Sequence, residues 1–143
     1  MTKRILIMGL PGAGKTTLAE ALQTRLDAQD KKTVWLNADR VRTEYNDWDF
    51  SEAGRIRQSK RMRELADRLE CDYAIADFVA PLVEMRKNYN ADYTVWVDTI
   101  DSGRFEDTNK AFVAPDVYDV RVTEQDADKW AEIIVNNILR HYE

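Results

Sequence analysis

Segment 9–16 constrains the fold more than any other part of the chain, because it reads Gly-Leu-Pro-Gly-Ala-Gly-Lys-Thr and completes a G-x-x-x-x-G-K-[ST] pattern. The apolar run at 5–8 predicts a buried strand leading into this segment, and residues 17–22 predict a helix leaving it. In such a loop the backbone N–H groups wrap a polyphosphate, the lysine reaches the outer phosphates and the hydroxyl ligates Mg²⁺. The helix adds its positive amino-terminal dipole. The sequence therefore predicts a nucleoside triphosphate site.

We expect ATP and Mg²⁺ as the cofactors of this site. The predicted nucleotide-binding residues are those of the loop and the first helical turn: Gly9, Pro11, Gly12, Ala13, Gly14, Lys15, Thr16 and Thr17.

Strand and helix signals alternate along the rest of the chain. Strands are predicted at 5–8, 33–36, 73–76, 93–97 and 118–122, and helices at 17–29, 39–45, 81–89 and 127–141. A further long helix follows Ser51, which is a plausible N-cap. The last helix is expected to turn Trp130, Ile133, Ile134, Asn137 and Ile138 inward, and 98–116 is expected to be an irregular flap. The pattern predicts an α/β fold with a parallel five-stranded sheet and helices on both faces, in one domain over 1–143.

The charge distribution favours a focused anion site. The net charge of −5 disfavours broad nucleic-acid binding, yet basic residues crowd the stretch from 40 to 63. For Arg57, Lys60 and Arg63 we expect a solvated helix face paired with Glu52 and Glu64. The sequence shows no apolar run of membrane-spanning length and no signal peptide, and the lone Cys71 excludes an internal disulfide, so a cytoplasmic location is predicted.

Three aspartates follow predicted strands and should meet at the carboxyl edge of the sheet: Asp39, Asp77 and Asp98. We predict that Asp77 supports Mg²⁺ together with Thr16. Asp39 would orient an acceptor hydroxyl, and Arg42, one helical turn on, would hold an anionic group of the same substrate. Capping of the helix by Asp39 is the alternative, and the two roles can coexist. The predicted catalytic residues are Lys15, Asp39 and Arg42.

Several segments resemble the adenylylsulfate (APS) kinase family in colinear order from about residue 4 to 115. Residues 36–42, Leu-Asn-Ala-Asp-Arg-Val-Arg, are similar to the Leu-Asp-Gly-Asp-Asn-Val-Arg segment of that family. Phe50-Ser51 with Arg55 resembles the Gly-Phe-Ser…Asp-Arg motif, and 78–81 with Arg86 resembles Phe-Ile-Ser-Pro…Arg. Residues 105–115 are similar to the Phe-Thr-Gly…Tyr-Glu-Ala-Pro segment.

This resemblance implies a P-loop NTPase-like kinase that converts ATP and APS to ADP and 3′-phosphoadenylylsulfate. It implies a substrate pocket formed by Asp39, Arg42, Phe50, Arg55, Gln58, Phe78, Pro81 and Phe105, with Phe50 and Phe105 clamping the adenine. The sequence departs from the family at Gln58 for Asn, Ala80 for Ser and Asp77 for Ala. Only residues 100–104 stand where the family carries its Arg-Asp-x-Lys-Gly-Leu-Tyr lid.

Three functions remain open from the sequence. The first is a kinase for APS or another small anionic, hydroxyl-bearing adenylyl compound. The second is a kinase for a nucleoside or polynucleotide 5′-hydroxyl, because Asn37-x-Asp39-x-x-Arg42 is also similar to a segment of phage polynucleotide kinases. The third is a nucleotide-binding module without catalysis. A homodimer is left open, a membrane partner is not expected, and nucleic acid is disfavoured by the absence of an extended basic stripe.

Overall fold

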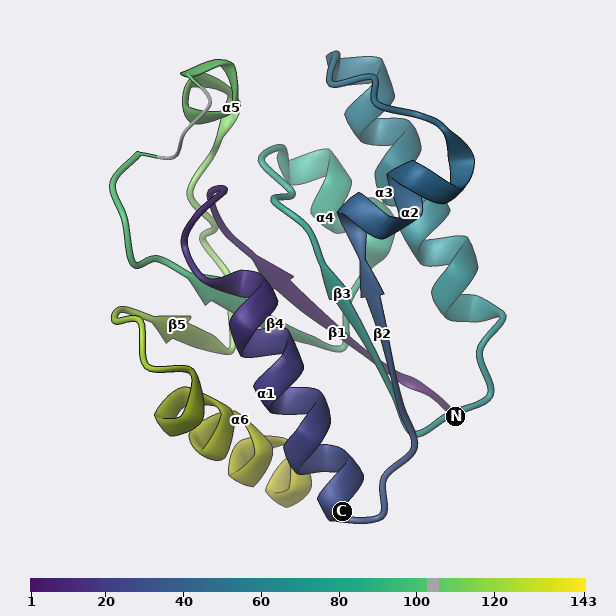
Figure 1. The fold of residues 1–143 in the computed structure, drawn as a ribbon, viewed down its shortest axis with the longest axis vertical. Helices are drawn as coiled ribbons and strands as arrows, with labels where there is room; N and C mark the ends of the chain where they lie inside the picture. Colours follow the sequence, from purple (N-terminus) through teal and green to yellow (C-terminus); the bar gives the residue numbers. More distant parts are fainter. Residues whose placement is uncertain (103–105) are drawn as a thin grey trace.

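A parallel sheet forms the centre of the molecule in the computed structural model, which describes residues 1–102 and 106–143. Its five strands are β1 (Lys3–Met8), β2 (Thr33–Asn37), β3 (Tyr73–Asp77), β4 (Tyr93–Val97) and β5 (Val120–Val122). They are arranged in the order β2-β3-β1-β4-β5, with every neighbouring pair parallel (Figure 1). The predicted α/β fold with a parallel five-stranded sheet is thereby confirmed.

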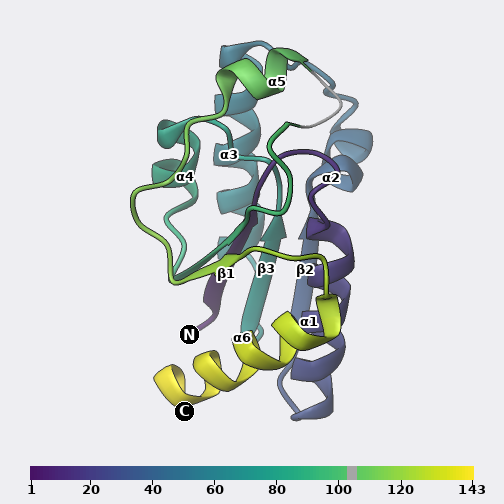
Figure 2. The same cartoon turned by 90° about the vertical axis from the view of Figure 1, so that its left-hand side faces the viewer.

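Helices cover both faces of the sheet (Figure 2). The described helices are α1 (Lys15–Ala28), α2 (Ala38–Tyr45), α3 (Glu52–Asp67), α4 (Val83–Tyr89), α5 (Glu106–Ala111) and α6 (Ala127–Tyr142). Helices α1 and α6 pack together on one face, and α3 and α4 pack together on the other. This is the layered arrangement that buries both faces of a parallel sheet.

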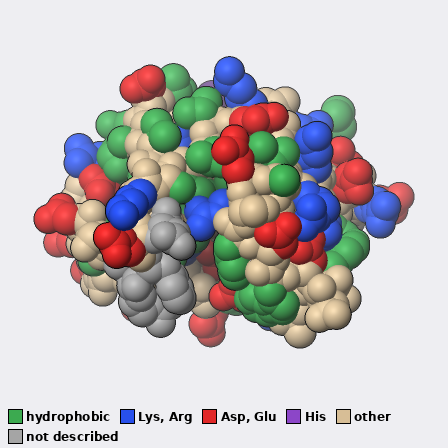
Figure 3. Space-filling view, turned by 90° about the horizontal axis from the view of Figure 1, so that it is seen from above, with side chains coloured by type: hydrophobic (Ala, Val, Ile, Leu, Met, Phe, Trp, Pro, Cys, Tyr) green, Lys and Arg blue, Asp and Glu red, His purple; other side chains and the backbone are tan. Residues whose placement is uncertain are grey.

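The carboxyl ends of the strands all point toward one edge, as parallel pairing requires. The loop at 9–14 follows β1 there, and the connections after β2, β3 and β4 leave from the same edge. Figure 3 looks onto this edge, where Lys and Arg side chains lie beside hydrophobic ones. Ligands of open parallel sheets bind at this edge.

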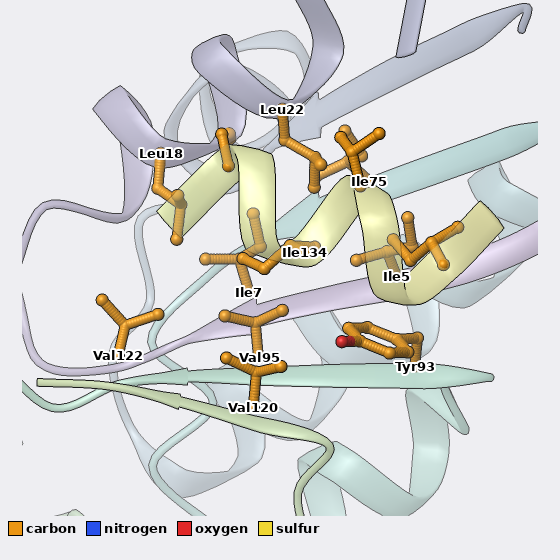
Figure 4. Close-up of a cluster of buried hydrophobic side chains, with 14 of the residues drawn as sticks. Ile5, Ile7, Leu18, Leu22, Ile75, Tyr93, Val95, Val120, Val122 and Ile134 are labelled. Atoms are coloured by element: carbon orange, nitrogen blue, oxygen red, sulfur yellow. The ribbon is translucent and has the colours of Figure 1, made fainter. Parts of the chain in front are cut away.

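Alternation along β1 divides the core between the two faces. Ile5 and Ile7 point toward α1 and α6, where Leu22 and Ile134 are also fully buried (Figure 4). Leu6 and Met8 point the other way, into a cluster that contains Met62, Met85 and Tyr89 of α3 and α4. Each buried aliphatic side chain contributes roughly 1.5–3 kcal/mol through removal from water.

Several predicted boundaries are wrong. β5 covers only Val120–Val122, and α5 occupies part of the stretch expected to be irregular. α4 begins at Val83 rather than Pro81, because the Pro81 carbonyl accepts a hydrogen bond from Val113 N (2.8 Å) and stays in the connection. Ile133 is exposed (36 %), since the buried stripe of α6 runs through Ala131, Ile134, Val135 and Ile138.

The basic helix face also pairs differently from the expectation. Arg57 pairs with Asp47 and Asp49 of the preceding connection, and Arg63 pairs with Asp67. Neither pair uses the expected Glu52 or Glu64. The 46–50 connection folds back onto α3 and brings its carboxylates to Arg57, and Asp67 lies one helical turn after Arg63 within α3.

No helix within 1–102 and 106–143 combines the length and the apolar character that a bilayer span requires.

Candidate active site

The loop between β1 and α1 is shaped by its glycines. Gly12 and Gly14 have φ values of 89° and 104°, which side-chain-bearing residues rarely adopt. A Cβ atom on Gly9 would lie 2.4 Å from the Val97 carbonyl oxygen, so the backbone passes closely over the end of β4. Gly14 caps α1, and glycine has no side chain that could accept hydrogen bonds from the backbone N–H groups of the first turn. The loop therefore provides a backbone cradle that fits a polyphosphate.

Lys15 lies over this cradle and is nearly buried, at 9 % exposure. Its Nζ donates a hydrogen bond to the Leu10 carbonyl oxygen at 3.0 Å. A lysine so placed reaches the space above the loop by rotating its flexible side chain, where the outer phosphates of a nucleotide would lie.

Asp77 ends β3 directly beside the loop strand, in register with Ile7 of β1 and Asn37 of β2. Its Oδ2 accepts hydrogen bonds from Thr16 Oγ1 and from Asn37 Nδ2, both at 3.1 Å. Burial raises the pKa of the Asp77 carboxyl above its ordinary value, while the Lys15 charge and these hydrogen bonds act in the opposite direction. The carboxylate is thus held against the hydroxyl of the loop threonine.

This pair fits Mg²⁺ as that ion is bound with nucleotides. Mg²⁺ is typically held by one or two protein oxygens, substrate phosphates and water rather than by an all-protein cage. The described residues contain no group of three or more His, Cys, Asp or Glu side chains placed to hold a metal.

Asp39 lies exposed in the first turn of α2 and lines the cleft in front of the loop. It is not the helix cap: Asn37 caps α2, its side chain accepting from Arg40 N at 3.1 Å. The capping alternative for Asp39 is therefore wrong. Its carboxylate makes no hydrogen bond or ion pair to any residue that the structure describes, which leaves it available to a ligand.

Arg42 also lines the cleft, but it has a structural task that the sequence did not predict. It is almost fully buried, and Nη1 donates to the carbonyl oxygens of Asp47 (3.0 Å) and Asp49 (3.3 Å). Its guanidinium lies 4.4 Å from the Phe50 ring centroid, a cation–π contact. Burial lowers the pKa of Arg42 from its ordinary value, although the side chain stays charged near neutral pH.

Arg55 connects the cleft to α5. Its Nε donates to the Phe50 carbonyl oxygen at 2.9 Å and its Nη2 to Thr108 Oγ1 at 3.0 Å. Gln58, buried at 1 % exposure, donates through Nε2 to the Ala38 carbonyl oxygen at 3.2 Å. Both long polar side chains are therefore held in place at the cleft wall.

Arg86 stabilises the part of the cleft wall that contains Phe78 and Pro81. Its guanidinium donates to the carbonyl oxygens of Ala80 (2.9 Å), Pro81 (3.3 Å) and Val113. Burial lowers the pKa of Arg86 to about 10. Ala80 has a φ of 48°, in the left-handed region that non-glycine residues rarely adopt. This wall is a constrained turn tied to the segment after α5.

One cleft of about 560 Å³ brings most of the predicted residues together. It is lined by Pro11, Gly12, Lys15, Thr16, Asp39, Arg42, Phe50, Arg55, Gln58, Asp77, Phe78 and Pro81, and additionally by Trp48 and Thr108. The predicted Phe105 lies outside the described residues. Asp98, the third rim aspartate, does not line the cleft and is paired with Arg121.

A second cavity of about 190 Å³ lies on the other side of the loop, and the sequence analysis missed it. Gln125, just after β5, donates through Nε2 to the carbonyl oxygens of Gly12 (3.3 Å) and Ala13 (3.4 Å). Thr99 Oγ1 donates to the Ala13 carbonyl oxygen at 2.6 Å. Their position just beyond predicted strands, at the carboxyl edge, is the signal that could have identified them.

Sequence comparison decides the family. The model of the adenylylsulphate kinase family, described as "Adenylylsulphate kinase", matches residues 1–100. The chain belongs to the adenylylsulphate kinase family. The family match ends before 105–115, so the resemblance of that segment stays a prediction.

Two curated relatives are similar to this family member over somewhat more than half of its length. An adenylyl-sulfate kinase of Burkholderia ambifaria is 37 % identical over 89 residues, which are 59 % of this chain and 49 % of that protein. The bifunctional enzyme NodQ of Rhizobium sp. (strain BR816) is 39 % identical over 77 residues, 51 % of this chain and 12 % of that protein. The chain thus spans about half or less of the relatives that it matches.

The family fold is also found in a solved structure. The Mycobacterium tuberculosis APS kinase CysC, in complex with AMPPNP and APS, superposes with a TM-score of 0.79 over 96 % of this chain and 97 % of that one, at 20 % identity. At this identity the likeness establishes the fold.

Proposed function

We propose that this chain is an ATP-dependent kinase that transfers the γ-phosphoryl group of ATP to the 3′-hydroxyl of APS or a closely similar adenylyl compound. The observation that carries the proposal is the shared cleft. It joins a phosphate cradle with Lys15 to the Asp39 carboxylate, which pairs with none of the described residues, and to a buried guanidinium, Arg42, beside an exposed ring, Phe50. Family membership supports the same reaction.

In this proposal the donor lies along the loop. Backbone N–H groups of 9–16 bind its phosphates, and Lys15 leaves the Leu10 carbonyl to bridge the outer phosphates. The donor base lies in the second cavity, between the loop and the residues after β5. Thr16 and Asp77 would hold Mg²⁺, and a bound Mg²⁺ would supply positive charge to the transferred group.

The acceptor occupies the larger cleft. Asp39 accepts a hydrogen bond from the attacking hydroxyl and orients it in line with the terminal phosphate. The Arg42 and Arg55 charges attract the acceptor's anionic group, while Phe50 supports its base. The protein forms no covalent bond to the transferred group in this reaction. The rate enhancement therefore comes from positioning of the reactants and from stabilisation of developing charge.

The proposed reaction takes place in the cytoplasm and uses a single domain over 1–143, with small anionic substrates rather than long nucleic acid.

A transfer assay tests this proposal. We expect label from γ-labelled ATP to appear in 3′-phosphoadenylylsulfate when APS and Mg²⁺ are present, and APS to raise the melting temperature of the protein in ADP and Mg²⁺. Label on a 5′-hydroxyl oligonucleotide or nucleoside, with none on APS, would select the other kinase. ATP binding without transfer to any acceptor would contradict catalysis.

A further inference from the structure

Two large aromatic side chains stand exposed at the mouth of the cleft. Trp48 is 48 % exposed and Phe50 is 53 % exposed, and both line the cavity. Their ring centroids are 6.3 Å apart, with the planes tilted by 49°. Neighbouring exposed aromatic rings beside a cavity are a common mark of a binding surface, because leaving them in water is unfavourable.

The segment that carries Trp48 is held in place on both sides. The Asp47 carboxylate accepts from Arg57 Nε and Arg61 Nη2, both at 2.9 Å. The Asp49 carboxylate accepts from Arg57 Nη2 (3.2 Å) and Ser51 N (2.9 Å). An aromatic ring between two anchored residues loses little conformational freedom when a ligand binds, which favours affinity.

Phe50 and Trp48 differ in what already covers them. One face of the Phe50 ring has the Arg42 guanidinium at 4.4 Å, and Arg55 lies 6.0 Å from the same centroid. Among residues 1–102 and 106–143, no Lys or Arg lies over the Trp48 indole in this way. The indole therefore offers the cleft a larger and less occupied π surface than Phe50 does.

We infer that Trp48 is a specificity-determining residue of the acceptor site, stacking on the acceptor's planar base while the buried arginines hold its anion. This inference rests on the proposed kinase function, because it requires an acceptor with a base. It assigns to the site a ligand class of nucleotide shape: a flat ring at Trp48, an anionic group near Arg42 and a hydroxyl near Asp39. Acceptors that lack the base would gain nothing from Trp48.

Binding of AMP tests the inference, with the donor site first saturated by ADP and Mg²⁺. We expect AMP to quench tryptophan fluorescence in the wild type and in Trp96→Phe, but not in Trp48→Phe. Trp96 is a matched control because it packs on Tyr118 and Arg121, away from the cleft. By calorimetry, Trp48→Ala should weaken AMP binding roughly 5- to 150-fold, the effect of losing one base–aromatic stack, and Trp48→Phe should weaken it less.

Ribose 5-phosphate is the base-free probe, and its affinity should be the same in wild type and Trp48→Ala. Equal AMP affinity in wild type and Trp48→Ala would overturn the inference and leave the proposed kinase function standing. An equal loss of affinity for AMP and for ribose 5-phosphate in Trp48→Ala would also overturn it, because Trp48 would then maintain the shape of the cleft and make no specific contact with the base. Wild-type protein that binds neither AMP nor APS would overturn both proposals. Unchanged ADP binding and melting curves verify that each variant is folded.

Discussion

At the scale of single residues, the site depends on charges that the fold holds close together. Lys15 and Asp77 face the same cleft, and each is almost fully buried. Asp77 is anchored to Thr16 and Asn37 at the ends of two neighbouring elements. Such groups act through position, so removing one should change a specific step rather than the whole fold.

Lys15→Ala tests the phosphate-binding role. Since the lysine charge is expected to bridge the outer phosphates and stabilise the transferring group, kcat should fall by at least ~100-fold. Steady-state kinetics with saturating APS measure it. Near-normal turnover in this variant would contradict the proposed donor geometry.

Asp77→Asn tests the metal-supporting role. We expect the Mg²⁺ concentration needed for half-maximal ADP stabilisation to rise by about 10- to 100-fold, because the amide carries no charge. The unliganded protein should not lose stability, since burial already disfavours the charged carboxylate. Thermal melts over a Mg²⁺ series measure both effects.

Asp98→Asn is the matched control, because this carboxylate also follows a strand but pairs with Arg121 outside the cleft. The same Mg²⁺ dependence in wild type and Asp77→Asn would rule out the role of Asp77.

At the scale of elements, the connection between α2 and α3 decides the shape of the acceptor site. Its carbonyls are held by Arg42, and its carboxylates by Arg57 and Arg61. Ser51 caps α3, as the sequence predicted, by accepting from Gly54 N at 3.1 Å. The connection is therefore a fixed part of the cleft wall.

Gly54→Ala should displace this connection. A Cβ atom there would lie 2.2 Å from the Asp49 carbonyl oxygen, so the helix and the connection cannot both keep their places. We expect a loss of about 1–3 kcal/mol in the free energy of unfolding and a higher KM for the acceptor, with ADP affinity unchanged. Denaturant titration and kinetics check this, with the exposed neighbour Ala53→Ser as control. Wild-type stability and acceptor KM in Gly54→Ala would show that the connection is not fixed.

The ion pairs of Asp47 should make the free energy of unfolding depend on pH in the acidic range. Hydrogen bonds from Arg57 and Arg61 hold the pKa of the Asp47 carboxyl far below its ordinary value of 3.8. The ion pairs therefore contribute their full stabilisation at pH values above 3.8. That contribution is lost as the pH falls below 3.8, because Asp47 is then protonated in the unfolded state before it is protonated in the folded state. In melts from neutral pH downward, the deficit of Asp47→Asn relative to wild type should shrink below about pH 4. A deficit that stays constant with pH would contradict the ion-pair explanation.

At the scale of the whole molecule, the packing of α1 and α6 on the sheet fixes the position of the helix that follows the nucleotide loop. Leu22, Ile134 and Ile138 are fully buried between these helices and the strands. Because this core lies on the face where α1 leaves the loop, its packing sets the direction of the helix that follows the phosphate cradle (Figure 4).

Ile134→Ala should lower the free energy of unfolding by about 2–5 kcal/mol, because it leaves a cavity in a closed core. Ile133→Ala, at the exposed neighbouring position, should change it by less than about 0.5 kcal/mol. Chemical denaturation measures both. Equal effects of the two substitutions would contradict the observed orientation of α6.

Much of the fold could be predicted because its signals are local. The apolar run before Gly9 and the helix after Lys15 required strand, loop and helix in that order. The extent of α5 and the start of α4 could not be predicted in this way, since the Pro81 carbonyl is held by Val113, a contact between segments far apart in sequence. The roles assigned to the site residues stay predictions.

The sequence alone determined the phosphate loop, the alternation of strands and helices, and the family, because these depend on residue type and spacing within short segments. Only the tertiary structure decided that Asp77 contacts Thr16 and Asn37, that Arg42 supports the segment before Phe50, and that Trp48 faces the cleft. The physical reason is that strand order and the return of the 46–50 connection onto α3 bring together groups that no local pattern places side by side.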